Sequence, residues 1–427
     1  MLQPYKKYKS VDLNFAKQIP IDWTLKRGKF FFKEISERSK KGEEQLLSVS
    51  EHKGIVPRDS INVTMFQALS YEGYKLCNKG DIVINSLWAW HRGLGVSEHH
   101  GIVSTVYGVY RPLRPEQWNH RYLNYLIRDK TYVGECLIRS KGIWESRYLL
   151  SGRNFLDIPI LQPPLEVQNS IVAYLDKKNS EIDKFIRNKE RLVELLEEEK
   201  QSVIRKAVTK GEDSKFKFKE TGIDWIGEIP ENWDIKKLKY CSKIIYGISP
   251  HENTYNDKGI GSVLINGPVE YSEENFGYTR ELKWTKDPKK FAPKESLLFC
   301  LRGSTTGRLN ICHDDVSIGR GVAAIISETS QDFIIYAIKA LVDFISDSFK
   351  GSTFPSVTSE DLNNYLIPLP PTIEEQSRIV EFLNKETKMF DLAISKAQKE
   401  ISSIKEYREA LITDLVTGKR SLNCDLE

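Results

Sequence analysis

Two stretches of the sequence combine the residue types that contact phosphates and nucleobases. Residues 86–93 read SLWAWHRG, residues 302–308 read RGSTTGR, and residues 319–321 read GRG. An arginine beside a glycine can bring its backbone and guanidinium close to a phosphate or a base edge, and serine or threonine hydroxyls can bond to either. The candidate contact residues are Trp88, Trp90, His91, Arg92, Arg147, Arg153, Arg302, Ser304, Thr305, Thr306, Arg308 and Arg320.

These candidates have simpler alternatives. Trp88 or Trp90 could fill the core of its own domain, because a tryptophan buries a large apolar area. Arg302, Arg308 and Arg320 could be ordinary surface charges. The formal net charge of +4 allows a basic face that is balanced by acidic helices, but it does not require one.

The sequence carries none of the motifs of common catalytic or cofactor sites. It contains no G-x-x-x-x-G-K-[ST] loop, no H-E-x-x-H pair and no G-x-S-x-G elbow. The tetrapeptide with which amino-methyltransferases hold a target base (Asn or Asp, Pro-Pro, an aromatic) is also missing, and the Pro-Pro pairs lie in QPPL and LPPT instead. The seven histidines show no metal-ligand spacing. We therefore expect no catalytic residue and no metal site in this chain.

Length and composition indicate an ordinary globular protein of several domains. A chain of 427 residues exceeds one compact core, and 40% of its residues are hydrophobic and 29% charged. Six scattered cysteines without a C-x-x-C pair favour a reducing compartment. The first residues, MLQPYKKYKS, have no apolar core, and no apolar run is long enough to span a bilayer. These features predict a cytoplasmic protein.

The elements that must position the loops occur twice. From Ile158 the chain reads IPILQPPLEVQNSIVAYLDKKNSEID, and from Ile367 it reads IPLPPTIEEQSRIVEFLNKETKMFD. One offset of 208 residues relates Gln168 to Gln376, and a similar offset of 210 relates Trp23 to Trp233. The chain is thus two copies of one module, each a globular stretch followed by a helix, which implies pseudo-two-fold symmetry.

Each globular stretch shows strand and helix patterns in the same order. Residues 81–85 and 103–109 are rich in β-branched and aromatic residues, as strands are, and residues 116–127 have a helical apolar face. In the second copy the predicted elements are strands at 296–301 and 322–327 and a helix at 333–349. The sequence predicts domains at 1–157 and 216–366, followed by helical regions at 158–215 and 367–427.

The two helical regions share one apolar register. Alternating steps of four and three residues from Ile182 give six apolar residues in eight, and the same positions in the second copy give seven in eight. Lys200 and Arg408 interrupt the two registers at equivalent places. This pattern is typical of a coiled-coil seam, in which a polar residue can fix register. The alternative is two independent amphipathic helices, each lying on its own domain.

The combination of these features resembles the specificity subunit of type I restriction–modification enzymes over nearly the whole chain. The matching features are the duplicated module, the Ile-Pro…Pro-Pro…Gln exits, the paired helices, and the segments at residues 80–90, 95–112, 297–308 and 319–325. Neither exit shows the full P-P-L-x-E-Q pattern of the family. The resemblance implies an α+β fold, in which two similar target-recognition domains are separated by two long helices that form an antiparallel coiled coil.

The resemblance also implies a function and partners. Each target-recognition domain would read one half of a bipartite double-stranded DNA site. Two modification subunits with S-adenosylmethionine would methylate adenine, and restriction subunits with ATP and Mg²⁺ would translocate and cut, while this chain itself would bind no cofactor. The candidate partner-interface residues at the helix starts are Pro164, Glu166, Gln168, Pro371, Glu375 and Gln376. The alternatives are an autonomous DNA-modifying enzyme with divergent motifs and a protein-only scaffold.

The length of the predicted helices fits a DNA target. From Ile182 to Ala207 the seam extends roughly 38 Å at about 1.5 Å per residue. One turn of B-DNA is roughly 34–36 Å. The helices would therefore place two readers about one duplex turn apart.

Overall fold

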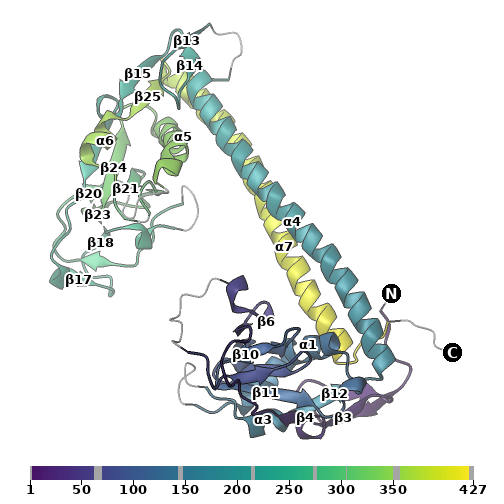
Figure 1. The fold of residues 1–427 in the computed structure, drawn as a ribbon. Helices are drawn as coiled ribbons and strands as arrows, with labels where there is room; N and C mark the ends of the chain where they lie inside the picture. Colours follow the sequence, from purple (N-terminus) through teal and green to yellow (C-terminus); the bar gives the residue numbers. More distant parts are fainter. Residues whose placement is uncertain are drawn as a thin grey trace. The chain divides into compact units, whose positions relative to one another are not determined.

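The chain folds into two compact units, each built around one half of two long helices. The computed structural model describes residues 2–61, 70–142, 148–212, 217–272, 277–303, 305–349 and 356–422. The first unit comprises residues 1–189 and 399–427, and the second comprises residues 190–398. Helix α4 (Leu165–Lys210) and helix α7 (Ile373–Val416) each contribute to both units (Figure 1).

The first unit contains a four-stranded antiparallel sheet with core on both faces. Ile82 and Ile84 face one apolar cluster, whereas Val83 faces another, because successive side chains of a strand point to opposite faces. All three side chains are buried. In sheet order the strands are β4 (Phe32–Glu34), β11 (Tyr107–Pro112), β8 (Ile82–Asn85) and β9 (Leu94–Val96).

The second unit repeats this sheet. Leu297 and Phe299 face one cluster, and Leu298 faces the other, so the same alternation of two buried faces recurs. In sheet order the strands are β16 (Ser242–Tyr246), β24 (Val322–Ser327), β21 (Leu297–Cys300) and β22 (Leu309–Ile311). The shared strand order supports the duplication that the sequence predicts.

In each unit a helix follows one of the inner strands of the repeated sheet, β11 in the first unit and β24 in the second. Helix α1 (His120–Arg128) buries Tyr122, Leu123 and Leu126, and α5 (Gln331–Phe349) is its counterpart. Helix α1 begins later than the sequence pattern predicts, because the Asn119 side chain accepts hydrogen bonds from the first backbone N–H groups of the helix. Helices α2 (Lys130–Arg139) and α3 (Gly152–Leu156) complete the helices of the first globular part, and α6 (Ser359–Asn364) belongs to the second.

One predicted strand is wrong. Residues 103–109 form the end of one strand and the start of another, because the backbone N–H of Tyr107 donates to the carbonyl of Ser104 in a turn. The composition of this stretch favours a strand throughout, and a short turn without glycine or proline leaves little signal.

The remaining strands form small sheets that flank the repeated ones. In the first unit the pairs are β1 (Tyr8–Ser10) with β2 (Gln18–Pro20), β3 (Thr24–Arg27) with β12 (Pro159–Gln162), β5 (Leu47–Ser50) with β6 (Gly54–Pro57), and β7 (Lys75–Cys77) with β10 (Gly101–Val103). In the second unit they are β13 (Phe218–Glu220) with β14 (Glu228–Pro230) and β15 (Asp234–Lys237) with β25 (Leu366–Leu369).

A five-stranded sheet lies beside the repeated sheet in the second unit, whereas the described residues of the first unit form two-stranded pairs beside theirs. It includes one parallel pair, β18 with β23. In sheet order the strands are β17 (Tyr255–Asn256), β19 (Trp284–Thr285), β18 (Ser262–Ile265), β23 (Val316–Ile318) and β20 (Phe291–Ala292). The two units therefore share a framework and differ in the parts attached to it.

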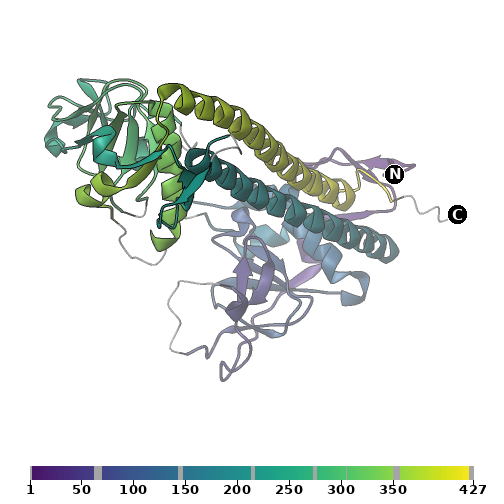
Figure 2. The same ribbon diagram turned by 90° about the horizontal axis from the view of Figure 1, so that it is seen from above.

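Within each unit the two long helices run side by side and antiparallel (Figures 1 and 2). In the first unit Arg408 pairs with Asp183, and Lys189 Nζ lies 2.6 Å from Glu400 Oε2, so residue numbers fall on one helix as they rise on the other. Pairing of the helices is thereby confirmed over the alternative of two independent helices.

The two polar interruptions of the seam are ion-paired in equivalent ways. In the second unit Lys200 Nζ lies 2.5 Å from Asp391 Oδ1. The offset of 208 that relates Lys200 to Arg408 also relates Asp183 to Asp391. Each unit thus places one cation of the seam against one aspartate of the other helix, which is the arrangement that fixes register at a polar seam position.

Candidate nucleic-acid interface

The loop after β8 in the first unit exposes an aromatic side chain. Ala89 is fully buried and occupies the core position of the loop, and the neighbouring Trp88 remains 56% exposed. Trp90 is half-buried, donates from Nε1 to the carbonyl of Leu87 at 2.9 Å, and contacts the Tyr148 ring edge-on. Trp88 is thus available for contact, whereas Trp90 stabilises the loop.

Arg92, a predicted contact residue, holds this loop to the long helix α7. Its guanidinium binds the Glu409 carboxylate through two hydrogen bonds, of which Nη1 to Oε1 measures 3.1 Å. The hydrogen bond to Glu409 raises the pKa of Arg92. Arg92 has a left-handed backbone, with φ of 57°. Its guanidinium is therefore engaged inside the first unit and anchors the loop.

Arg128 of α1 hydrogen-bonds the backbone at the end of the same loop. Its guanidinium donates to the backbone carbonyls of Leu94 and Glu51, each at 2.5 Å, and also to those of Ser50 and Arg92. Burial lowers the pKa of Arg128 to about 10. The sequence gives no sign of this role, because an arginine at the end of an amphipathic helix has no distinguishing pattern.

The other candidates of the first unit lie at the surface where they are described. His91 is exposed, and its Nε2 lies 3.4 Å from Glu51 Oε2. Arg153 is exposed on α3. Arg147 lies outside the described residues.

In the second unit the loop after β21 contains both exposed and engaged candidates. Arg302 is exposed, and its backbone pairs with Ser356. Arg308 is half-buried, because its Nη2 donates to the carbonyl of Ser272 at 2.8 Å. Arg320 is exposed in the turn between β23 and β24. Ser304 lies outside the described residues.

The two threonines of this loop contact neighbouring residues of the same segment. Thr306 Oγ1 donates to the carbonyl of Gly303 at 2.8 Å. Thr305 Oγ1 lies 3.6 Å from Cys300 Sγ, and both threonines are half-buried. These contacts shape the turn from which Arg302 projects.

The glutamines at the helix starts are buried in a joint between each globular part and its helix. Gln168 Oε1 accepts from the backbone N–H of Asn119 at 2.9 Å, and Nε2 donates to the carbonyls of Pro163 at 2.9 Å and Gln117 at 3.0 Å. Neither Gln168 nor Gln376 is more than 2% exposed. Both side chains are therefore buried within their own unit, and their role at a partner interface stays a prediction.

Gln376 makes the equivalent contacts in the second unit. Its Oε1 accepts from the backbone N–H of Ser330 at 3.1 Å, and its Nε2 donates to the carbonyl of Pro370 at 3.2 Å. Glu375, another predicted interface residue, accepts from Trp233 Nε1 at 2.9 Å and is half-buried. Pro164, Glu166 and Pro371 are exposed.

A tyrosine completes each joint. Tyr125 of α1 hydrogen-bonds Asp176 Oδ1 at 3.0 Å and accepts from Asn179 Nδ2 at 2.9 Å. Burial, assisted by the Asp176 charge, raises the pKa of Tyr125 to about 12. In the second unit Tyr336 of α5 bonds Asn384 Oδ1 at 2.8 Å and lies 3.3 Å from Thr387 Oγ1. Each globular part is thus fixed to its helix by the same hydrogen-bonded elements.

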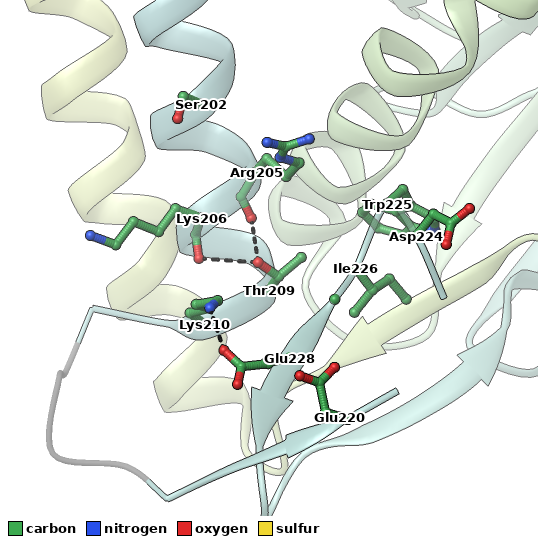
Figure 3. A pocket seen from close by; sticks show the side chains of 11 residues that line it. Ser202, Arg205, Lys206, Thr209, Lys210, Glu220, Asp224, Trp225, Ile226 and Glu228 are labelled. Carbon is green, nitrogen blue, oxygen red and sulfur yellow. Dashed lines mark hydrogen bonds and ion pairs between the residues drawn. The ribbon is translucent and has the colours of Figure 1, made fainter. Parts of the chain in front are cut away.

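A polar pocket of about 400 Å³ lies in the second unit where α4 ends (Figure 3). Lys210 Nζ lies 2.7 Å from Glu228 Oε2, and Thr209 Oγ1 donates to the carbonyl of Arg205 at 2.8 Å. Three basic and three acidic side chains line the pocket together, so it offers no field of one sign to a phosphate backbone. The lining residues are Ser202, Arg205, Lys206, Thr209, Lys210, Glu220, Asp224, Trp225, Ile226, Gly227 and Glu228.

The described residues contain no group of three or more His, Cys, Asp or Glu side chains that could hold a metal ion. In the same part of the chain, no helix combines the length and hydropathy that a membrane span requires.

Comparison with known proteins identifies the family. The family model described as "Type I restriction modification DNA specificity domain" matches residues 230–403. The putative type I restriction enzyme MjaX specificity subunit of Methanocaldococcus jannaschii is 33% identical over 310 residues, which are 70% of this chain and 67% of that protein. This chain belongs to the family of type I restriction enzyme specificity subunits.

Two further similarities extend over nearly the whole chain. The MjaVIII specificity subunit of the same organism is 26% identical over 94% of this chain and 94% of that protein. A solved chain from work on complex assembly and conformational transition of the type I R-M system matches with a TM-score of 0.74 and 20% identity, covering 94% of this chain and 99% of that one. As a specificity subunit, the chain serves DNA sequence recognition in a restriction–modification complex.

Proposed function

We propose that each unit of this specificity subunit reads one half of a bipartite DNA site and that partner subunits then methylate adenine or cut the DNA. The observation that carries this proposal is that the two units share one sheet framework, whereas the loops attached to it differ between the units. The four-stranded sheets have the same order, and the joints use equivalent residues. The loops after β8 and β21 differ in sequence, as readers of two different half-sites would require.

The exposed side chains of these loops suit contact with DNA. Trp88 offers an aromatic face that can stack on a base or enter a groove. Arg302 and Arg320 offer guanidinium donors that pair with phosphate oxygens or with guanine. Arg153 would add a phosphate contact in the first unit.

The chain would act without catalysis of its own. Its sequence lacks the tetrapeptide with which amino-methyltransferases hold a target base and the glycine-rich loop that binds nucleotide phosphates. Modification subunits would carry S-adenosylmethionine, and restriction subunits would bind ATP and Mg²⁺. The exposed helix starts at Pro164, Glu166 and Pro371 are candidate contacts for such partners.

The test is a methylation assay with and without partners. The purified chain is mixed with a random-sequence plasmid library and S-adenosylmethionine, alone or with modification subunits from the same host, and methylated adenines are mapped. We expect no methylation by the chain alone and a bipartite motif with the partners. Methyl transfer by the chain alone would favour an autonomous enzyme. A purified chain that shows no salt-dependent binding to DNA would favour a protein-only scaffold.

A further inference from the structure

Three segments of the second unit meet at Arg320. The backbone N–H of Arg320 donates to Ser249 Oγ at 3.1 Å, and Ser249 Oγ donates to Asn266 Oδ1 at 3.0 Å. Ser249 follows β16, Asn266 follows β18, and Arg320 lies between β23 and β24. The exposed arginine is therefore held at its backbone by a chain of two hydrogen bonds.

The glycine before Arg320 is required by this arrangement. A Cβ atom on Gly319 would lie 1.9 Å from Asn266 Oδ1, so no larger residue fits while Asn266 stays in place. The Gly319 N–H donates to the carbonyl of Ile265 at 2.9 Å, and the Ile248 N–H donates to that of Ile318 at 3.0 Å. The turn is thus fixed to two neighbouring strand ends, and its position does not depend on the Arg320 side chain.

The side-chain groups of Asn266 and Arg320 that remain without a partner are hydrogen-bond donors. Ser249 gives its proton to Asn266 Oδ1, which leaves the two N–H donors of Asn266 Nδ2. The Arg320 guanidinium has five donors and no acceptor. Within the part of the chain that the structure describes, neither Nδ2 nor the guanidinium has a hydrogen-bond acceptor. Asn266 is half-buried and Arg320 is exposed.

Charged groups of both signs lie near this turn: Lys283 Nζ is 3.6 Å from Oε1 of the buried Glu270, and no described carboxylate forms an ion pair with Arg320. Lys283 Nζ lies 5.6 Å from the centre of the Tyr255 ring, and the Tyr255 hydroxyl donates to the carbonyl of Pro250 at 3.0 Å. Partial burial and the Glu252 charge raise the pKa of Tyr255, and the nearby Arg320 charge opposes that shift. Lys283 is already paired with Glu270, so among the described residues Arg320 remains the unpaired cation at this place.

Among base edges in the major groove, guanine matches a set of donors best. It presents two acceptors, N7 and O6, whereas adenine pairs its N7 acceptor with an N6 donor that needs an acceptor from the protein. We propose that Ser249, Asn266 and Arg320 form one reading unit of the second module, in which Arg320 and Asn266 bind the acceptor edge of a guanine and Ser249 positions both. This proposal rests on the proposed DNA-reading function and names the base that this part of the site would read.

A phosphate is the competing ligand for the same donors. A phosphate contact carries no sequence information, and its loss weakens all sequences alike while lowering the salt slope by about one. A base contact instead affects one position of the motif. The fixed turn favours the base, because a rigid backbone gives the guanidinium a defined reach.

The experiment uses the full chain assembled with its modification subunits. The methylated motif of the unaltered complex is mapped first, and each guanine of each half-site is then replaced by 7-deazaguanine, which lacks the N7 acceptor. We expect one replacement in one half-site to weaken binding about 10- to 100-fold. Arg320→Ala or Asn266→Ala should weaken binding to the normal site and make that replacement nearly harmless. Arg320→Lys should keep the salt slope but lose discrimination at that position, since lysine lacks the planar fork.

Two variants separate positioning from folding. Ser249→Ala removes two hydrogen bonds and should relax the same motif position, in a chain that loses some thermal stability but remains folded at the assay temperature. Asn384→Asp is the matched control, because the first unit has Asp176 at the equivalent place of its joint, and this variant should leave the motif unchanged.

The outcomes distinguish this proposal from the proposed function. A bipartite motif that Arg320→Ala, Asn266→Ala and Ser249→Ala all leave unchanged would overturn the reading unit alone. Uniform weakening with a reduced salt slope would assign Arg320 to a phosphate and also overturn it. An unaltered complex without a bipartite motif would overturn both proposals.

Discussion

Replacing the buried glutamine of one joint should loosen that unit and spare the other. Gln168→Ala removes three hydrogen bonds and leaves the N–H of Asn119 and the carbonyls of Pro163 and Gln117 without this partner. At about 1 kcal/mol for each bond, the loss is about 3 kcal/mol. For a unit of this size the melting temperature should fall by about 6–12 °C.

The second unit supplies a graded comparison. Gln376→Ala removes two hydrogen bonds, so its expected cost is about 2 kcal/mol. Hydrogen–deuterium exchange resolved by peptide would locate each effect, with faster exchange in α1 for the first variant and in α5 for the second. Glu166→Ala, at an exposed residue of the same helix start, is the control and should change neither stability nor exchange.

A Gln168→Ala variant as stable as the unaltered chain would contradict a structural role for this side chain. If its melting temperature and exchange matched the unaltered chain while binding to modification subunits fell, Gln168 would be a partner contact, as its position in the sequence suggested. If only exchange in the second unit changed, the two joints would not be independent.

Three further predictions follow from the helices and the first loop. Lys200→Asp should destabilise the second unit by placing two carboxylates together, and adding Asp391→Lys should restore most of the loss in a urea unfolding assay. Arg92→Ala should speed proteolysis of the loop after β8 while leaving melting of the second unit unchanged. A heptad inserted after both Leu196 and Ile404 keeps the seam in phase and adds about 10 Å of helix. The methylated motif should then gain a spacer of about two to four base pairs or be lost, whereas methylation at the original spacing would show that the helices do not set the distance.

Much of the framework could be predicted from the sequence, because it depends on apolar periodicity. The strand at residues 322–327 and the shared register of the long helices both appear as regular patterns of buried residues. The duplication supported each of these predictions, because the same apolar pattern occurs at equivalent positions of both copies. The turn at Ser104 was missed because it lies within a stretch whose composition favours strands.

The sites were harder to predict because they depend on contacts between distant segments. The sequence around Arg92 is that of an exposed arginine, and its partner Glu409 lies 317 residues away in the chain. Ser249 and Asn266 lie in unremarkable loops, and only the strand pairing places them beside Gly319. The polar interruptions of the helical seam were visible, but their partners could be named only from the antiparallel pairing.

The central claim is that each unit reads its own half-site, and a module exchange tests it most directly. Residues 20–157 would be replaced by the corresponding region of a relative that recognises a different sequence, and methylated adenines would be mapped for the chimaera with its modification subunits. The account predicts a motif in which one half changes to that of the relative while the other half and the spacer are retained. A motif in which both halves change together would contradict it.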